Sequence, residues 1–183
     1  MIITVVLSMI ITPFVLKNIK NISDRFTSEP SGLRDRALIG DSYHNHIIIC
    51  GYGPVGRRLA KLFREKDLLY IILEHDVKIV DKEIEKGEEA IYFANAAQKM
   101  VLSHFNVNDS TAIIVTIENE IQRQLICENI ASFNPDINSI VRVNNSGEEE
   151  LISALGIRHI INSRDAIADM LAEEALACHL KTN

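Results

Sequence analysis

The sequence predicts an α/β protein built on a Rossmann-type, doubly wound parallel sheet of six strands. Short apolar runs alternate with segments whose apolar residues recur at helical spacing, and this alternation is typical of a parallel sheet covered by helices. A glycine-rich turn, residues 51–56 (GYGPVG), directly follows the first apolar run. The usual strand order of this architecture, 3-2-1-4-5-6, predicts a ligand site at the carboxyl edge of the sheet.

Buried strands are expected wherever apolar, mostly β-branched residues run without interruption. The expected strands span 46–50, 68–73, 90–93, 111–116, 139–143 and 159–161. Helices are expected at 54–66, 76–86, 98–104, 118–133, 147–155 and 164–180. The last helix is predicted to carry one apolar side, made by Ile167, Met170, Leu171 and Leu176.

Length and composition narrow the class of protein. A chain of 183 residues has room for one domain of ordinary size and a short appendage. The net charge of -6 argues against nucleic acid, because phosphate backbones are bound through an excess of Lys and Arg. Three widely separated cysteines indicate a reducing compartment and exclude a disulfide framework. His44 and His46 have no further ligand at metal-binding spacing, so a metal site is not expected.

The first residues differ from the rest of the chain. Residues 1–16 carry no charge, and Lys17, Lys20 and Arg25 follow them. Sixteen helical residues span about 24 Å, less than the roughly 30 Å hydrocarbon core of a membrane. We therefore expect residues 1–17 to be the end of a transmembrane helix, with the remainder of the chain on the cytoplasmic side. A core helix or strand of a soluble protein is the alternative. A polar linker is expected at 18–45.

The glycine turn satisfies the pattern G-x-G-x-x-G between a predicted strand and a predicted helix. In this context Gly51 permits the tight turn, Gly53 lets the backbone approach a pyrophosphate, and Gly56 allows the helix to pack closely on the strand. The positive end of the helix then faces the phosphates. A glycine turn without a ligand is the alternative interpretation.

An acidic residue, Glu74, stands eighteen positions after Gly56, at the end of the second predicted strand. A carboxylate at this place accepts hydrogen bonds from both ribose hydroxyls and repels a 2′-phosphate. The expected ligand is therefore an adenine nucleotide without a 2′-phosphate: NAD(H), AMP, ADP or ATP. A solvated strand end is the other reading of Glu74.

Further candidates lie in the glycine turn or where other strands end, at the carboxyl edge of the predicted sheet. They are Tyr52, Pro54 and Val55 in the turn, with His75, Asn95, Ala96, Thr116 and Glu118 at the strand ends. Ordinary loop polarity explains the last four equally well. Arg57 and Arg58 begin the first helix, where they either meet phosphate or form an exposed helix face.

These features together resemble the cytoplasmic regulator of potassium conductance domain, the TrkA-N domain, of Kef-type monovalent cation:proton antiporters. Residues 46–56 (HIIICGYGPVG) are similar to the family's first strand and glycine loop, and residues 7–13 (LSMIITP) to the end of its final transmembrane helix. Residues 155–157 resemble its closing Leu-Gly-Ala segment. Asn95 replaces the usual Asp, and Pro54 stands where an Arg often lies near phosphate, which weakens charge-based binding of a di- or triphosphate.

The resemblance implies a nucleotide-sensing regulatory domain of a potassium or other monovalent cation:proton antiporter, and no enzyme. It places the chain at the inner or cell membrane, as part of a longer antiporter, with the nucleotide-binding domain (46–163) on the cytoplasmic side. Residues 164–183 would form a closing helix that joins two copies into a homodimer. Two alternatives stay open: an NAD-dependent oxidoreductase, for which no Tyr-x-x-x-Lys motif is present, and a soluble Trk/Ktr-like channel-gating subunit.

Overall fold

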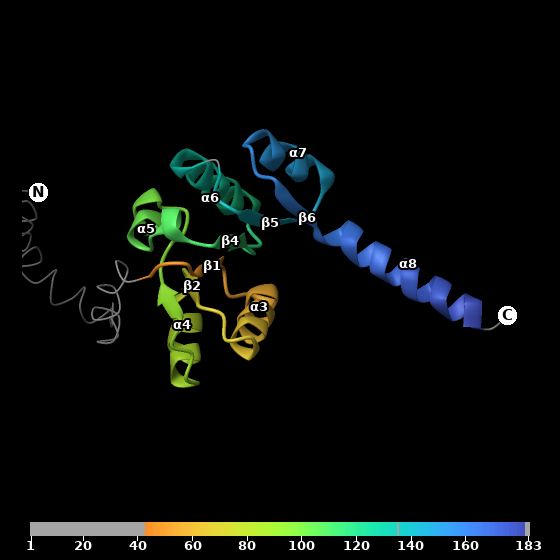
Figure 1. Cartoon of the computed structure of the whole chain (residues 1–183), viewed down its shortest axis with the longest axis horizontal. Helices are drawn as coiled ribbons and strands as arrows, with labels where there is room; N and C mark the ends of the chain where they lie inside the picture. The colour runs from red at the N-terminus through yellow and green to blue at the C-terminus, as the bar shows by residue number, and fades with distance from the viewer. Residues whose placement is uncertain (1–42, 135, 182–183) are drawn as a thin grey trace, which may run out of the picture. The chain divides into compact units, whose positions relative to one another are not determined.

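Figure 1 shows a computed structural model of the chain, which describes residues 43–134 and 136–181. Six strands form one parallel sheet in the order β3-β2-β1-β4-β5-β6, which confirms the predicted fold class and strand order. The expected membrane-helix end at 1–17 and nearly all of the linker at 18–45 lie outside the described residues. None of the helices in the described part of the chain combines the length and apolar composition that a membrane crossing requires.

Strands and helices alternate along the chain. The strands are β1 (Ile47–Cys50), β2 (Tyr70–Glu74), β3 (Ile91–Phe93), β4 (Ala112–Val115), β5 (Ser139–Val143) and β6 (His159–Asn162). The helices are α3 (Pro54–Glu65), α4 (Val77–Glu85), α5 (Lys99–His104), η2 (Val107–Asp109), α6 (Glu120–Phe133), α7 (Ser146–Ala154) and α8 (Ser163–Lys181). The short 3-10 helix η2 is not among the elements that the sequence predicts.

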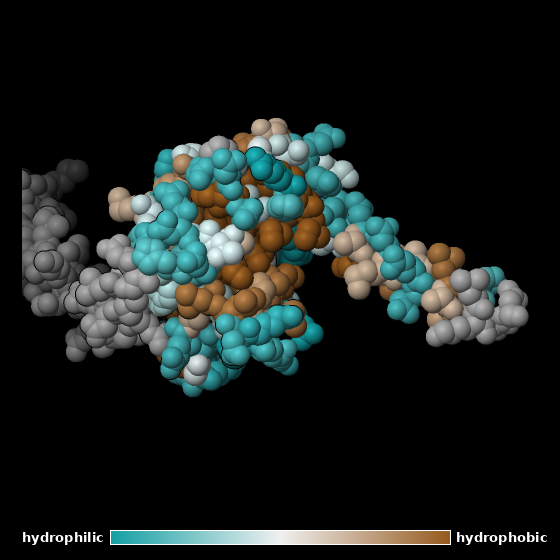
Figure 2. Space-filling model, viewed as in Figure 1, coloured by the Kyte–Doolittle hydropathy of each residue, from teal (hydrophilic) through white to brown (hydrophobic). Residues whose placement is uncertain are grey.

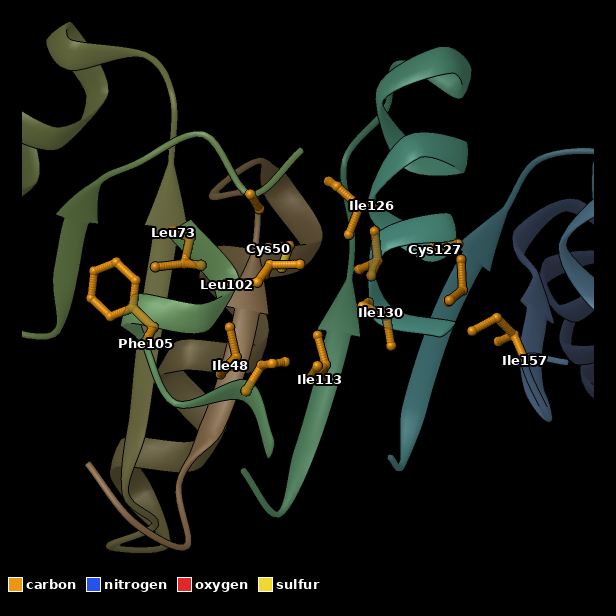
Figure 3. Close-up of a cluster of buried hydrophobic side chains, with 14 of the residues drawn as sticks. Ile48, Cys50, Leu73, Leu102, Phe105, Ile113, Ile126, Cys127, Ile130 and Ile157 are labelled. Atoms are coloured by element: carbon orange, nitrogen blue, oxygen red, sulfur yellow. The ribbon is translucent and has the colours of Figure 1, made fainter. Parts of the chain in front are cut away.

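The helices cover the sheet in two layers. In Figure 1, α3 and α4 lie on one side of the sheet, while α5, α6 and α7 lie on the other. The main core fills the space beneath the second group. Figure 3 shows Ile48, Cys50 and Ile113 of the central strands facing Leu102 of α5 and Ile126 of α6, and all of these side chains are fully buried. Burial of such apolar surface is the main free-energy gain of folding.

All predicted strand and helix boundaries lie within two residues of those in the structure, and the start of β2 shows why some are displaced. The strand starts at Tyr70, which pairs with Ile47 of β1, whereas the apolar run predicted a start at residue 68. Leu68 donates its backbone N–H to the carbonyl of Phe63, so it belongs to the turn that ends α3. Leu68 and Leu69 are consequently 43% and 52% exposed.

Side-chain caps decide where two helices begin. The side chain of Asn119 accepts a hydrogen bond from the backbone N–H of Gln122 at 2.9 Å. Asn145 accepts one from the N–H of Glu148 at 2.9 Å. Because an N-cap residue satisfies amides that the first helical turn leaves unpaired, α6 begins at Glu120 rather than at 118, and α7 at Ser146 rather than at 147.

The last helix, α8, is exposed along nearly all of its length. Side chains from Ile167 to His179 are all exposed to solvent, so α8 does not close over the sheet of its own chain. The prediction of a single apolar side on this helix is wrong for one of its four residues, Leu176. Leu176 lies nine positions after Ile167, about two and a half turns at 3.6 residues per turn, and therefore projects from the opposite side of the helix. The apolar stripe consists of Ile167, Met170 and Leu171.

The two halves of the sheet differ in coverage. On the face beneath α3 and α4, Ile49 of β1 and Ile72 of β2 are fully buried. The same face continues into Ile114 of β4 and Ile140 of β5, which are only half-buried, and Ile161 of β6 is 51% exposed. Figure 2 shows hydrophobic side chains at the surface over this second half of the sheet and along α8.

Candidate functional site

The turn between β1 and α3 uses its three glycines in three different ways. Gly51 has a φ of +99°, and a Cβ there would lie 2.9 Å from Cγ1 of Ile117. A Cβ on Gly56 would lie 2.2 Å from the carbonyl oxygen of Gly51. Gly53 has neither constraint, because a Cβ there would meet nothing within 4 Å. Gly51 and Gly56 are therefore required by the turn and its packing, whereas Gly53 faces open space that a ligand can enter.

The start of α3 is suited to an anion. Pro54 occupies the first helical turn, which contains no acidic residue, and the amides of a first turn have no intrahelical partner. Pro54 and Val55 are exposed. Arg57 donates its Nε–H to the carbonyl of Tyr52 at 3.2 Å, and its guanidinium lies 5.5 Å from the centre of the Tyr52 ring. Amide dipoles and a guanidinium thus give this end of the helix a positive potential.

Glu74 connects the glycine turn to the turn after β2. Its Oε2 accepts a hydrogen bond from the N–H of Tyr52 at 2.7 Å. Its Oε1 accepts from the N–H groups of His75 at 2.8 Å and Asp76 at 2.9 Å. A carboxylate offers about four acceptor positions, so one is left for a ligand hydroxyl. Accepting both ribose hydroxyls, as the sequence predicts, requires Glu74 to release one of these amides.

Tyr52 and His75, whose backbone amides both bond to Glu74, differ in the exposure of their side chains. The Tyr52 side chain is only 5% exposed, and burial raises the pKa of its phenol to about 12, with the Glu88 and Glu83 carboxylates adding to the shift. The phenol is therefore neutral and packed inside, and Tyr52 contributes its backbone to the turn. The exposed imidazole of His75 places Nδ1 3.1 Å from Oε1 of Glu74.

The remaining predicted site residues are distributed unevenly. The hydroxyl of Thr116 lies 3.1 Å from the carbonyl oxygens of both Cys50 and Gly51, so it contacts the backbone of the glycine turn. Asn95 is exposed, and its Oδ1 accepts the N–H of Ala97 at 3.0 Å. Ala96 is 2% exposed and belongs to the hydrophobic core, which leaves it no surface for a ligand. The Glu118 side chain is 71% exposed and lies 3.9 Å from Arg142.

Sequence reasoning missed several polar residues at the ends of β4 and β5. Arg123 of α6 and Glu148 of α7 form a buried ion pair. Arg142 donates from Nη2 to Oδ1 of Asn144 at 3.1 Å, while its Nε is buried without a hydrogen-bond partner. The sequence did carry a signal that could have located these residues: a charged residue inside the apolar run of β5, followed by two asparagines.

Thiol chemistry is not available beside the turn. Burial raises the pKa of Cys50 to about 12, and it does the same for Cys127. Both groups therefore remain protonated thiols at neutral pH and act as small apolar side chains. Among residues 43–134 and 136–181, no three His, Cys, Asp or Glu side chains are grouped so that they could hold a metal ion.

Comparisons with known sequences identify a domain family. The model of the TrkA-N domain family matches residues 47–163. The putative cation/proton antiporter YbaL of Escherichia coli is 27% identical over 129 residues, which cover 70% of this chain and 23% of YbaL. The match to potassium channel protein 1 of Methanocaldococcus jannaschii covers 28% of that protein. The chain thus spans less than a third of the length of these curated relatives.

Solved structures show the same fold. The crystal structure of the TrkA-N domain of inner membrane protein ybaL from Escherichia coli superposes with a TM-score of 0.66 at 26% identity, covering 72% of this chain and 96% of that one. The Kef CTD of Shewanella denitrificans in AMP-bound form gives 0.62 at 21% identity, covering 73% and 80%. The GsuK channel bound to NAD gives 0.62 at 17% identity, covering 84% and 27%. Since the family model covers more than half of the chain, the protein belongs to the TrkA-N domain family.

Proposed function

We propose that this chain is the nucleotide-sensing regulatory domain of a membrane antiporter that exchanges potassium or another monovalent cation for protons. The observation that carries the proposal is the open side of Gly53 at the positive end of α3. Neither the tight turn at Gly51 nor the close packing at Gly56 requires a glycine at position 53. A backbone that is left bare there lets a phosphate approach the first-turn amides.

The proposed ligand is an adenine nucleotide without a 2′-phosphate. The phosphate group would bind the amides of the glycine turn, with Arg57 beside it. The ribose would bind the free acceptor position of Glu74, whose buried charge disfavours a 2′-phosphate. Relatives with the same fold support this class of ligand, since one structure holds AMP and another NAD.

We further propose that two copies of the chain associate through α8. A single copy leaves an apolar surface on each of two elements: Ile114, Ile140 and Ile161 on the sheet, and the stripe of Ile167, Met170 and Leu171 on α8. Burying both surfaces against each other removes them from water. The exposed α8 of one copy thus supplies the layer that the second half of the sheet lacks in the other copy.

Regulation then follows from differential affinity. A nucleotide changes the state of the transporter only if it binds one arrangement of the domains more tightly than the other. The relatives that are antiporters or channels support a place at the cytoplasmic side of the inner or cell membrane. The membrane partner would be the antiporter domain, reached through residues 1–45. We propose no catalytic step.

Calorimetric titration of the full chain with AMP, ADP, ATP, NAD+ and NADH tests the ligand. At least one of them is expected to bind, and Gly53→Ala is expected to weaken that binding by about tenfold or more, since a methyl group displaces a phosphate from the amides it would contact. Gly147→Ala is the matched control: it places a methyl group in ordinary contact at the start of α7 and should leave binding unchanged. A wild-type chain that binds none of the five nucleotides refutes the proposed ligand class.

Sedimentation of the full chain tests the dimer. Ile167→Asp places a charge in the apolar stripe and is expected to shift the chain to monomer. Leu176→Asp changes an equally exposed leucine on the opposite side of α8 and is expected to leave the dimer intact. A wild-type chain that stays monomeric, or two variants that behave alike, contradicts this interface.

A further inference from the structure

The ion pair of Arg123 and Glu148 is almost completely buried between two helices. Arg123 of α6 is 1% exposed and Glu148 of α7 is 3% exposed, and the guanidinium bonds directly to Oε1 of the carboxylate. Removing two charges from water is costly, and apolar residues of similar volume often pack two helices equally well. The other hydrogen bonds of Arg123 and Glu148 therefore indicate which parts of the chain the pair holds in place.

On one side, the pair holds the loop that follows β4. Arg123 donates from Nη1 to the backbone carbonyl of Ile117. The Ile117 side chain lies where a Cβ on Gly51 would collide with it, and the hydroxyl of the preceding Thr116 bonds to the carbonyl of Gly51. The loop at 116–117 thus lies directly against the glycine turn, and Arg123 holds it there.

On the other side, the pair reaches the first residue of α8. Oε2 of Glu148 accepts the backbone N–H of Asn144 at 3.1 Å. Oδ1 of Asn144 lies 3.0 Å from the hydroxyl of Ser163, which lies 3.0 Å from the carbonyl of Val143 as well. Arg142 also donates to Oδ1 of Asn144, so this amide oxygen is held between an arginine and the start of α8.

We propose that Arg123 and Glu148 are positioning residues that couple occupancy of the proposed nucleotide site at the glycine turn to the position of α8. The relay runs from Gly51 through Thr116 and Ile117 to Arg123, Glu148, Asn144 and Ser163. Every link is a hydrogen bond or a van der Waals contact between groups that are buried or half-buried. A shift of the glycine turn therefore displaces the next group in the relay, because little solvent lies between them. The inference rests on the proposed function, because it assigns a route from that ligand to that interface.

The relay is best tested by a substitution at Ser163, its last residue. Replacing Arg123 leaves Glu148 buried without a counter-charge and threatens the fold itself. Ser163→Ala removes only a half-buried hydroxyl that touches neither the glycine turn nor the apolar stripe of α8. Ser153→Ala is the matched control, since Ser153 is an exposed serine of α7 outside the relay.

Hydrogen–deuterium exchange of the full chain, with and without AMP, measures the coupling. In the wild type and in Ser153→Ala, AMP is expected to slow exchange of the amides of α8 by about 2- to 10-fold, the range that one net hydrogen bond supplies. In Ser163→Ala, AMP is expected to bind with unchanged affinity while its effect on α8 disappears. An unchanged α8 response in Ser163→Ala, or AMP binding to the wild type with no response in α8, overturns the relay.

A ligand-free comparison separates this inference from the proposed function. If the wild type binds none of the five nucleotides, the proposed ligand class fails, and the relay is judged by exchange in the absence of nucleotide. Ser163→Ala is then still expected to speed amide exchange at residues 116–119, relative to both the wild type and Ser153→Ala. Equal exchange at 116–119 in all three proteins overturns the relay independently of the nucleotide.

Discussion

The turns after β1 and β2 and the turns after β4 and β5 lie at the same edge of the sheet, but they are held by different means. After β1 and β2, backbone groups lie close together: Gly56 lies against the carbonyl of Gly51, and three backbone amides donate to the side-chain carboxylate of Glu74. After β4 and β5, the paired side chains of Arg123 and Glu148 connect the two loops, one through the carbonyl of Ile117 and the other through the N–H of Asn144. Added side-chain atoms should therefore destabilise the first half of the edge, and removal of a charge should destabilise the second half.

The same contrast extends to the faces of the sheet. The first half is covered on both faces by helices of its own chain, whereas the second half leaves apolar residues of β4, β5 and β6 at least partly open among the described residues. The half that holds the glycine turn is thus complete in one copy. The half that leads to α8 has the properties of a surface that a partner covers, as proposed above.

The largest expected loss of stability comes from a substitution in the second half. Arg123→Met removes the counter-charge of a carboxylate that is 3% exposed, and loss of one partner of a buried pair costs about 3–5 kcal/mol of unfolding free energy. Urea denaturation of the two proteins measures the difference. The control is Arg158→Met, whose partner Asp136 is exposed, as is Arg158 itself, and whose loss should cost below about 1 kcal/mol. Similar losses in the two variants would show that the buried pair does not hold this half.

An intermediate effect is expected in the first half. Gly56→Ala places a methyl carbon 2.2 Å from the carbonyl oxygen of Gly51, so the strand and helix must separate at a cost of about 1–3 kcal/mol. Gly53→Ala, three residues earlier in the same turn, meets no atom within 4 Å and should change stability by less than about 0.5 kcal/mol. Thermal or urea unfolding of both variants measures this difference, and equal losses would contradict the assignment of packing to Gly56 alone.

The smallest effect concerns the opposite edge of the sheet, where His46 precedes β1. Burial lowers the pKa of this fully buried imidazole below 6.5, the Phe105 carbonyl opposes that shift, and the charge of His44 adds to it. The unfolded chain therefore binds a proton more readily than the folded one. The contribution of His46 to stability is complete above pH 6.5 and declines as the pH falls through 6.5 toward the lowered pKa.

Urea midpoints at pH 7.5 and 5.5 measure this dependence. His46→Phe is expected to reduce the loss of stability between the two values, because phenylalanine binds no proton. His44→Phe, at an exposed histidine two residues earlier, is expected to leave most of that loss in place. A wild-type midpoint that rises on acidification more than that of His46→Phe would have the wrong sign and would contradict a lowered pKa.

Residues that are neighbours in the chain determined much of this protein by themselves. Apolar runs and glycine spacing located all six strands and the turn after β1, because burial on both faces of a sheet and a positive φ impose local demands on residue type. The strand order followed from the usual arrangement of this fold class. Glu74 was found in the same way, since the end of β2 stands at a known distance along the chain from Gly56. The ligand that these residues bind stays a prediction.

Only the tertiary structure decided which distant groups meet. Arg123 and Glu148 are 25 residues apart. Thr116, whose hydroxyl bonds to the carbonyl of Gly51, is 65 residues from that glycine. No local pattern encodes either contact. Leu68 and Leu69 were predicted as strand because they are apolar, yet the strand begins only at Tyr70, and the N–H of Leu68 bonds to Phe63 at the end of α3. Hydrophobicity specifies that a residue favours burial, but the arrangement of the other elements determines whether a surface is there to bury it. For that reason the open face of the sheet became visible only in the folded chain.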